Sequence, residues 1–277
     1  MEIKINGQPA DITVENEKTI GDVIVNLDNW LANSGHRLSG LEIDNERIDV
    51  LSMDKTFQRE IGSIKVINIQ TSSYAGLYET SLLNLLNDIN EYVSLDFHEK
   101  NEFYGKWNKR AQAFFISEEI PDLLELCGNA FRGGSLKAES LISITEEMLR
   151  EVRDPQEEFL TLQSVINDVC EKLISLPLDV QTGKDKQAAQ TIQVFTAITE
   201  KIIRTYRHLC VQGYMAENEI TQLIGQFGGT VKELLDAYEK HDSVLIGDLC
   251  EYEVAPRLEQ LCNSIIDNCK KEKAGTK

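Results

Sequence analysis

The spacing of apolar residues changes once along this chain, and that change constrains its fold more than any other feature. Over roughly the first 70 residues, apolar and polar positions alternate in short runs such as Ile3 and Ile5, which is the period of a half-buried strand. From Tyr78 onward the apolar residues recur every three or four positions, as at Leu82 and Leu85, which is the period of an amphipathic helix. The sequence therefore predicts a small α+β domain followed by an all-α bundle.

Two residue pairs in the first part predict tight turns between strands. Asn6-Gly7 separates the first alternating run from a second one through Ile12 and Val14. Asp44-Asn45 separates a run ending at Ile43 from one that continues to Val50. Both pairs tolerate the positive φ angles of a two-residue hairpin turn, so we expect hairpins at both places.

One helix is predicted between these hairpins. Thr19 is a suitable N-cap, and Asp22 three residues later can complete a capping box. Gly35 stands where a left-handed helix end is expected. The apolar positions in between follow helical spacing: Ile20, Val23, Ile24, Leu27 and Leu31.

The order strand, strand, helix, then two or three strands, the last over Ile64–Ile69, resembles the β-grasp fold of ubiquitin and of the small sulfur-carrier proteins. The resemblance covers residues 1–70 and rests on element order. Those relatives act through a free C-terminal Gly-Gly, whereas here the last strand leads into Thr71–Gly76 and Gly133-Gly134 is internal. The resemblance therefore implies a docking or scaffolding module and no conjugation or carrier role.

The remainder reads as six or seven helices in an antiparallel bundle. Breaks are expected at Gly133-Gly134, Pro177, Gly183 and Pro256, and Asp154-Pro155 reads as an N-cap and first helical residue. A single apolar stripe is expected to begin at Tyr78 and to continue through Phe97, Trp107 and Phe114. The predicted division is a β-grasp-like domain over 1–70, a linker over 71–76, the bundle over 77–272 and a disordered tail over 273–277.

The charge of the chain limits its partners. A formal net charge of −18 disfavours nucleic acid and membrane surfaces. The one basic and aromatic segment, Tyr104–Arg110, is interpreted as a helix with Trp107 packed inward and its cations solvated. The six cysteines form no Cys-x-x-Cys pair and lie among apolar residues, so we expect core side chains in a reducing compartment. With no signal-like N-terminus and no long apolar run, the expected location is cytoplasmic.

Motifs of known chemistry are absent from the sequence, and no cofactor is predicted. The glycines Gly225, Gly228 and Gly229 lack the preceding strand and the lysine of a phosphate loop, so they predict a helix break or a close approach between helices. His98 and Glu102 have the i, i+4 spacing of a metal pair, but they belong to a charged run, and a solvated helix face is the preferred interpretation.

The segment 241–258 contains the candidate functional residues. It is similar to a segment of uncharacterised bacterial helical proteins. Gly247 lies inside its helical run and costs about 1 kcal/mol relative to alanine, which suggests that a small residue is needed there. The spacing of Asp248, Glu251 and Tyr252 places these three above one another on a helix. The candidate partner-binding residues are Asp242, Asp248, Glu251, Tyr252 and Arg257.

Three interpretations of this segment remain open. In the first it is a buried helix junction, in which Asp248 and Glu251 cap neighbouring helices and Tyr252 closes a hydrogen bond. In the second it is a partner-binding face anchored by Tyr252 and Arg257. In the third, Asp242, Asp248 and Glu251 join acids from other helices in a metal cluster, although the usual Glu-x-x-His signature is missing.

The sequence favours a non-enzymatic interaction protein, an adaptor or chaperone-like bundle with a β-grasp docking module. The expected partner is another protein that is basic or presents an amphipathic helix, because the bundle is strongly acidic. The alternative is a carboxylate-rich helical metal-binding protein or metal-dependent hydrolase, and a structural homo-oligomer is a third option.

Overall fold

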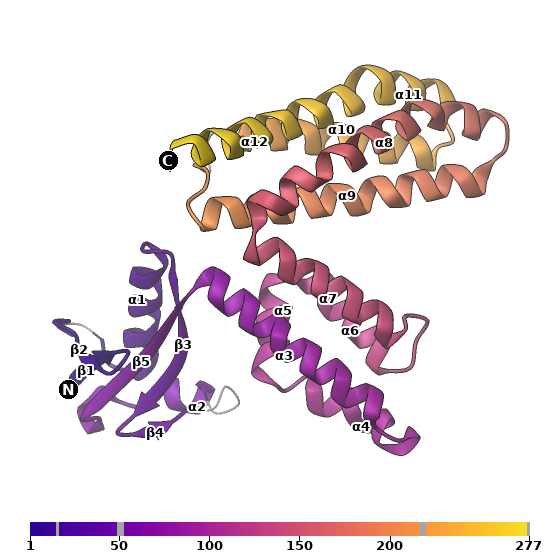
Figure 1. Cartoon of the computed structure of the whole chain (residues 1–277). Coiled ribbons are helices and arrows are strands. Elements are labelled where there is room, and N and C mark those ends of the chain that lie inside the picture. The colour runs from indigo at the N-terminus through magenta and orange to yellow at the C-terminus, as the bar shows by residue number, and fades with distance from the viewer. Residues whose placement is uncertain (15–16, 49–52, 217–219, 276–277) are drawn as a thin grey trace. The chain divides into compact units, whose positions relative to one another are not determined.

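The computed structural model describes residues 1–14, 17–48, 53–216 and 220–275. The chain divides into two compact units, Met1–Leu149 and Arg150–Lys277. The first unit contains a small sheet domain and a group of helices, and the second is all-helical (Figure 1). This agrees with the predicted fold class, an α+β domain followed by helices.

The sheet has five strands in the order β2-β1-β5-β3-β4. Central strand β5 pairs in parallel with β1 and antiparallel with β3, and the outer strands β2 and β4 are antiparallel to their neighbours. Helix α1 (Ile20–Ala32) lies against one face of the sheet, which gives a β-grasp-like arrangement (Figure 1). The strands are β1 (Glu2–Ile5), β2 (Gln8–Pro9), β3 (His36–Ile43), β4 (Glu46–Arg47) and β5 (Val66–Ser73).

Both predicted hairpin turns are confirmed. Asn6 and Gly7 have φ angles of 50° and 78°, and Asp44 and Asn45 have φ angles of 52° and 69°. The second strand is shorter than expected: β2 ends at Pro9, and the Ala10 amide makes one further hydrogen bond to the Ile3 carbonyl oxygen at 2.9 Å. Ile12 and Val14 therefore lie outside a strand, although they still pack against the sheet core. Val50, expected in a strand, is outside the described residues.

Helix α1 forms as its sequence predicts. The Thr19 hydroxyl accepts a hydrogen bond from the Asp22 amide at 3.2 Å, and the Asp22 carboxylate accepts one from the Thr19 amide at 2.9 Å. This is the predicted capping box, and its amide bonds lower the pKa of Asp22. Gly35, at φ 71°, turns the chain into β3. All five predicted apolar positions of the helix are buried: Ile20, Val23, Ile24, Leu27 and Leu31.

The sheet domain continues into the helical region without the expected linker. Strand β5 ends at Ser73, and helix α3 (Tyr74–Ser94) begins at the next residue. The Ser73 hydroxyl accepts a hydrogen bond from the Gly76 amide at 3.0 Å, so Ser73 is an N-cap as well as a strand end. Residues 71–76 are thus part of β5 and α3, and the domain boundary has no free segment.

The described residues after 73 form ten α-helices, more than the six or seven predicted. The predicted continuous stripe is interrupted because α3 ends at Ser94 and Asp96 caps a new helix with a capping box to Glu99. Phe97 and Phe114, assigned to that stripe, are exposed. The other helices of the first unit are α4 (Phe97–Trp107), α5 (Ala111–Glu119), α6 (Pro121–Phe131) and most of α7 (Ala138–Arg153), whose last turn from Arg150 belongs to the second unit.

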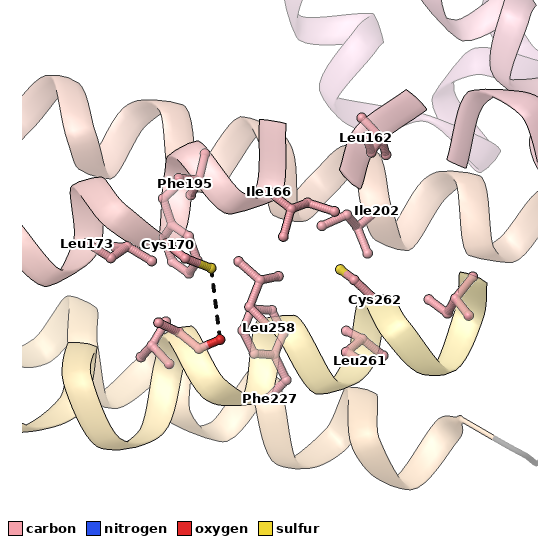
Figure 2. Packing of buried hydrophobic residues seen from close by; sticks show 14 of the residues in the cluster. Leu162, Ile166, Cys170, Leu173, Phe195, Ile202, Phe227, Leu258, Leu261 and Cys262 are labelled. Carbon is pink, nitrogen blue, oxygen red and sulfur yellow. Dashed lines mark hydrogen bonds between the residues drawn. The ribbon is translucent and has the colours of Figure 1, made fainter. Parts of the chain in front are cut away.

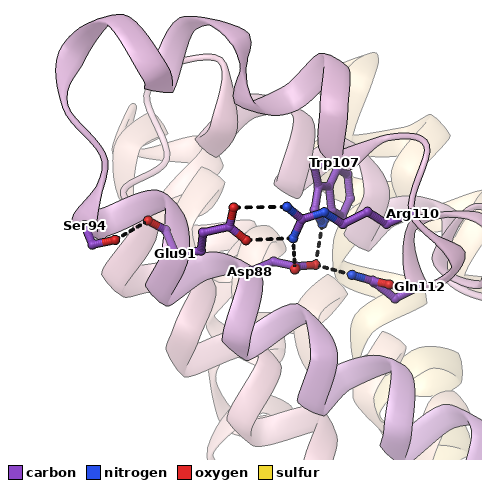
Figure 3. Close-up of polar contacts among 6 residues, drawn as sticks. All are labelled: Asp88, Glu91, Ser94, Trp107, Arg110 and Gln112. Carbon is purple, nitrogen blue, oxygen red and sulfur yellow. Dashed lines mark hydrogen bonds and ion pairs between the residues drawn. The ribbon is translucent and has the colours of Figure 1, made fainter.

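The prediction for the basic and aromatic segment Tyr104–Arg110 is confirmed in part. Trp107 is buried, as expected, and Lys106 is exposed and paired with Glu102. Arg110, however, is not simply solvated: it makes ion pairs with both Asp88 and Glu91 (Figure 3). The expectation of solvated cations is therefore wrong for Arg110, which holds α3 next to the end of α4.

The second unit is a bundle whose core is formed mainly by four long helices (Figure 2). Asp154 caps α8 through the Glu157 amide and Pro155 is its first residue, as predicted. Pro177 does not end this helix, which continues to Gln181. The elements are α8 (Pro155–Gln181), α9 (Asp185–Val211), α10 (Thr221–Glu239), α11 (Ser243–Leu249), a π-helical turn (Cys250–Val254) and α12 (Ala255–Gly275).

Two further expectations concern the end of the chain and the cysteines. Helix α12 extends to Gly275, so the expected disordered tail from 273 is helical at its start. The cysteines are core side chains, with five buried and Cys210 half-buried. The Cys170 thiol points toward the Ala255 carbonyl oxygen at 3.9 Å (Figure 2). Burial raises the pKa of Cys127, Cys250 and Cys262 to about 12, which keeps these thiols protonated and unreactive.

The glycines of α10 contradict both predicted explanations. The helix runs unbroken from Thr221 to Glu239 through Gly225, Gly228 and Gly229. A Cβ added at any of the three would meet no described atom within 4 Å outside the nearby helix backbone, so no close helix contact requires them. The three glycines are exposed on α10, so no packing contact of the folded unit requires them.

We expect Gly225→Ala, Gly228→Ala and Gly229→Ala together to stabilise the second unit by about 2–3 kcal/mol, since each alanine gains about 0.8–1 kcal/mol of helix propensity. Urea unfolding followed by circular dichroism measures the change. The matched control is Gly21→Ala in α1, where the new Cβ would lie 3.1 Å from the Phe57 carbonyl oxygen and gain little or destabilise. A triple variant with unchanged or reduced stability would contradict this reading of α10.

Candidate functional site

The candidate segment 241–258 connects three elements of the second unit. His241, at φ 54°, reverses the chain after α10, and helix α11 begins two residues later. The Asp242 side chain accepts a hydrogen bond from the Leu245 amide at 3.1 Å, so this carboxylate caps its own helix. Asp242 is thereby explained by local structure.

The π-helical turn lies between α11 and α12. Pro256, expected to interrupt a helix, is instead in the first turn of α12, directly after the π turn. Proline cannot donate to the carbonyl four residues before it, and a single π turn is a common way to accommodate such a change in a helix. The chain therefore stays helical from Ser243 to Gly275 with a local change of phase at Cys250–Val254.

Asp248, Glu251 and Tyr252 come together on the outer side of this turn. All three side chains are exposed, and 66% of Tyr252 is accessible. A hydrogen bond with Glu251 is the main cause that raises the pKa of Tyr252, and the negative charge of Asp248 contributes. These three residues thus lie close together, as predicted, despite the π turn.

Arg257 serves a different purpose. Its guanidinium forms an ion pair with Glu253 at 2.5 Å and donates a hydrogen bond to the Gln226 carbonyl oxygen of α10 at 3.3 Å. This side chain fastens the start of α12 to α10 and is half-buried. Its charge is already balanced by Glu253.

These contacts contradict the buried-junction interpretation for Asp248 and Glu251, because both are exposed. The buried side of the segment is apolar and belongs to the bundle core: Ile246, Leu249, Cys250, Val254, Ala255 and Leu258. Within the part of the chain that the structure describes, no group of three or more His, Cys, Asp or Glu side chains is placed to hold a metal ion.

Gly247 marks the place where α11 meets α8. A Cβ built on Gly247 would lie 3.5 Å from Cγ of Pro177, which is ordinary van der Waals contact. An alanine would fit there, while a larger side chain would have to displace the proline ring or turn outward. This contact between two helices limits the size of the residue at position 247, but it does not explain glycine in place of alanine.

Exposed apolar side chains flank the contact between Pro177 and Gly247. On α8, Ile174 and Leu178 are 54% and 59% exposed, one helical turn apart. On α11, Val244 is 70% exposed and lies about one turn before Gly247. We call these three residues, together with Tyr252, the α8–α11 surface; Figure 1 shows the two helices side by side at one end of the second unit.

The charge around this surface has one sign. Between Lys240 and Arg257 the chain contains four acidic residues and no Lys or Arg: Asp242, Asp248, Glu251 and Glu253. On α8, Glu171 precedes Ile174 by three residues and is exposed. Lys172 lines a groove with the first turns of α9, on another side of α8. The apolar side chains are thus bordered mainly by carboxylates.

Sequence reasoning identified Tyr252 and the acids but missed the apolar part of this surface. The buried position of α8 is occupied by Leu173, and Ile174 beside it is exposed. Residues adjacent in a helix differ by about 100° in direction, and at this point of α8 that difference places Ile174 outside the core. The available signal was the spacing of Ile174 and Leu178, since two apolar residues four positions apart lie on the same side of a helix.

No helix among the described residues combines the length and apolar character needed to cross a membrane.

Family comparisons match two separate parts of the chain. Residues 1–73 match the family described as the TP0873 N-terminal domain, a range that ends with strand β5. Residues 157–264 match a domain of unknown function, DUF8042, which includes all of α9, α10 and α11. Comparison with curated proteins and with solved structures finds no match. The α8–α11 surface therefore lies within a recurring domain that carries no assigned activity.

Proposed function

We propose that this chain is a non-enzymatic protein–protein interaction protein, an adaptor or chaperone-like helical unit joined to a β-grasp docking module of ubiquitin-like type. The observation that carries the proposal is the α8–α11 surface, which exposes three aliphatic side chains and a tyrosine in a bundle that already has a complete core. Exposed apolar groups gathered beside charged residues are typical of a protein-binding site.

The N-terminal module supports the same proposal. Its last strand passes directly into α3, so its end is not available for conjugation or sulfur transfer. The module is a small folded domain attached directly to the helices. Both edge strands are only two residues long, which limits uncontrolled pairing with other sheets.

Site-specific photo-crosslinking tests the proposal. A photoreactive phenylalanine analogue would replace Val244 in the full chain expressed in its own cells, and a matched chain would carry it at Val165, an exposed valine of α8 outside the α8–α11 surface. We expect Val244 to crosslink to one or a few defined proteins that Val165 does not reach. Equal crosslinking from both positions, or none from Val244, would contradict the proposal.

Two other results would assign the chain a different function. Crosslinks only between copies of this chain, with a dimer mass in light scattering, would identify a homo-oligomer. Stoichiometric iron, manganese or zinc in the purified protein, lost on Asp248→Asn or Glu251→Gln, would favour a metalloprotein.

A further inference from the structure

We propose that the α8–α11 surface binds a basic amphipathic helix of the partner protein. This inference rests on the proposed function and adds the chemistry of the partner. Three properties of the surface lead to it: the spacing of its apolar side chains, their position on both sides of the contact between Pro177 and Gly247, and the sign of the charge around it.

The apolar side chains match the repeat of a helix. Ile174 and Leu178 are separated by four residues on α8, and Val244 and Tyr252 are separated by eight residues on the other side. At 1.5 Å per residue the first separation is about 6 Å, which corresponds to one turn, and the second spans about two turns that include the start of the π turn. A partner helix with apolar residues at i, i+3, i+4 and i+7 presents the same repeat of about one turn.

The contact between Pro177 and Gly247 forms the floor of the surface. Glycine contributes no side chain there, and the proline ring lies within van der Waals reach of its Cβ position. The proline ring therefore packs on α11 at this point, between Ile174 and Leu178 on α8 and Val244 on α11. A partner helix would contact these three exposed side chains.

The charge favours a basic partner over an acidic or neutral one. Asp248 and Glu251 are exposed beside Tyr252, and the nearest cation in the sequence, Arg257, is engaged by Glu253 and by the Gln226 carbonyl. Lysines or arginines beside the apolar face of a partner helix would lie opposite these carboxylates. Such complementarity raises the association rate and makes binding depend on salt.

Tyr252 is suited to anchor such a helix. Its ring is exposed, and the neighbouring Glu251 carboxylate raises the pKa of Tyr252, which keeps the hydroxyl protonated. Tyrosine contributes apolar contact area through its ring while its hydroxyl stays in contact with a polar group or water.

Three synthetic peptides provide the direct test on the full chain. The probe is an 18-residue fluorescent peptide with Leu at i, i+3, i+4 and i+7 and Lys beside them. Its controls are the same peptide with Glu in place of Lys and a scrambled Lys peptide with no apolar face. We expect the Lys helix to bind at least tenfold more tightly than either control, as measured by fluorescence anisotropy.

Matched variants locate the site. Leu178→Ser with Val244→Ser should weaken binding of the Lys peptide about tenfold, whereas Val165→Ser with Val211→Ser, which removes two exposed valines elsewhere on the unit, should leave it unchanged. Asp248→Asn with Glu251→Gln should weaken binding and reduce its salt dependence, and the control Glu259→Gln with Asp267→Asn on α12 should do so less. All positions are exposed, so circular dichroism should show an intact fold.

The outcomes separate this inference from the proposed function. If the partner crosslinked at Val244 presents an acidic or non-helical segment, or if the site variants bind the Lys peptide as the parent does, the basic-helix inference is wrong and the interaction function stands. If Val244 captures no defined partner at all, the proposed function itself fails. A crosslinked segment that is helical, apolar on one face and rich in Lys or Arg would support both.

Discussion

Replacing Asp88 with alanine is expected to destabilise the first unit by about 3 kcal/mol, because the carboxylate is a buried acceptor for three donors. Asp88 is only 4% exposed. It accepts hydrogen bonds from Trp107 Nε1 at 2.8 Å and from Gln112 Nε2 at 2.6 Å, and it pairs with the Arg110 guanidinium (Figure 3). Alanine would leave the buried indole N–H without its acceptor and would remove one anion beside Arg110.

Glu91→Ala is the matched control for Asp88. Glu91 binds the same Arg110 guanidinium through two hydrogen bonds, at 2.8 and 3.0 Å, which lower the pKa of Glu91. Its side chain is 46% exposed, so its loss should cost less than about 1 kcal/mol.

Tryptophan fluorescence during urea unfolding measures both variants. The chain has two tryptophans, so a Trp30→Phe background leaves Trp107 beside Asp88 as the reporter. If Asp88→Ala and Glu91→Ala lowered the free energy of unfolding equally, the prediction that burial makes Asp88 more important for stability would be contradicted.

Replacing Arg204 with methionine is expected to cost about 3–5 kcal/mol in the second unit, because it removes a cation that donates two hydrogen bonds to a buried carboxylate. Glu151, in the last turn of α7, is 0% exposed and receives two hydrogen bonds from Arg204 of α9, at 2.6 and 2.8 Å. One turn further along α9, burial first and then the charge of Arg204 lower the pKa of His208 to about 4, so this histidine is neutral near pH 7.

A double-mutant cycle tests the Arg204 prediction. Glu151→Gln alone should cost less than Arg204→Met, since a neutral amide is easier to bury than a carboxylate. The two changes together should recover much of the loss. Arg150→Met is the control, since Arg150 is 59% exposed in its ion pair with Glu158 and should contribute less than about 1 kcal/mol. Additive single effects would mean that Glu151 and Arg204 do not act as a pair.

The features predicted correctly depend on residues close together in the sequence. The capping box of Thr19 and Asp22, the turn at Asn6-Gly7 and the cap at Asp154 each follow from backbone chemistry within about four residues. The five buried residues of α1 follow from spacing alone. Such features form wherever the local sequence allows them, provided that a core is available.

The predictions that are wrong in the helical region concern the positions at which helices end. A break such as Leu95-Asp96 hardly changes the apolar spacing, so α3 and α4 looked like one helix in the sequence. Pro177 and Pro256 were expected to interrupt helices, but packing of α8 and the π turn before α12 accommodate them. The polar partners of Asp88 and Glu151 are 19 or more residues away, beyond any local pattern.

The sequence by itself determined the change from sheet to helix near residue 73, the acidic character of the chain, and the grouping of Asp248, Glu251 and Tyr252, because all of these depend on composition and short spacing. The tertiary structure decided that Asp242 and Arg257 have structural contacts, and that Ile174, Leu178 and Val244 are exposed around one contact between helices. That arrangement depends on how α8 and α11 pack at Pro177 and Gly247, two residues 70 positions apart, and helical spacing alone does not specify which sides of two distant helices meet.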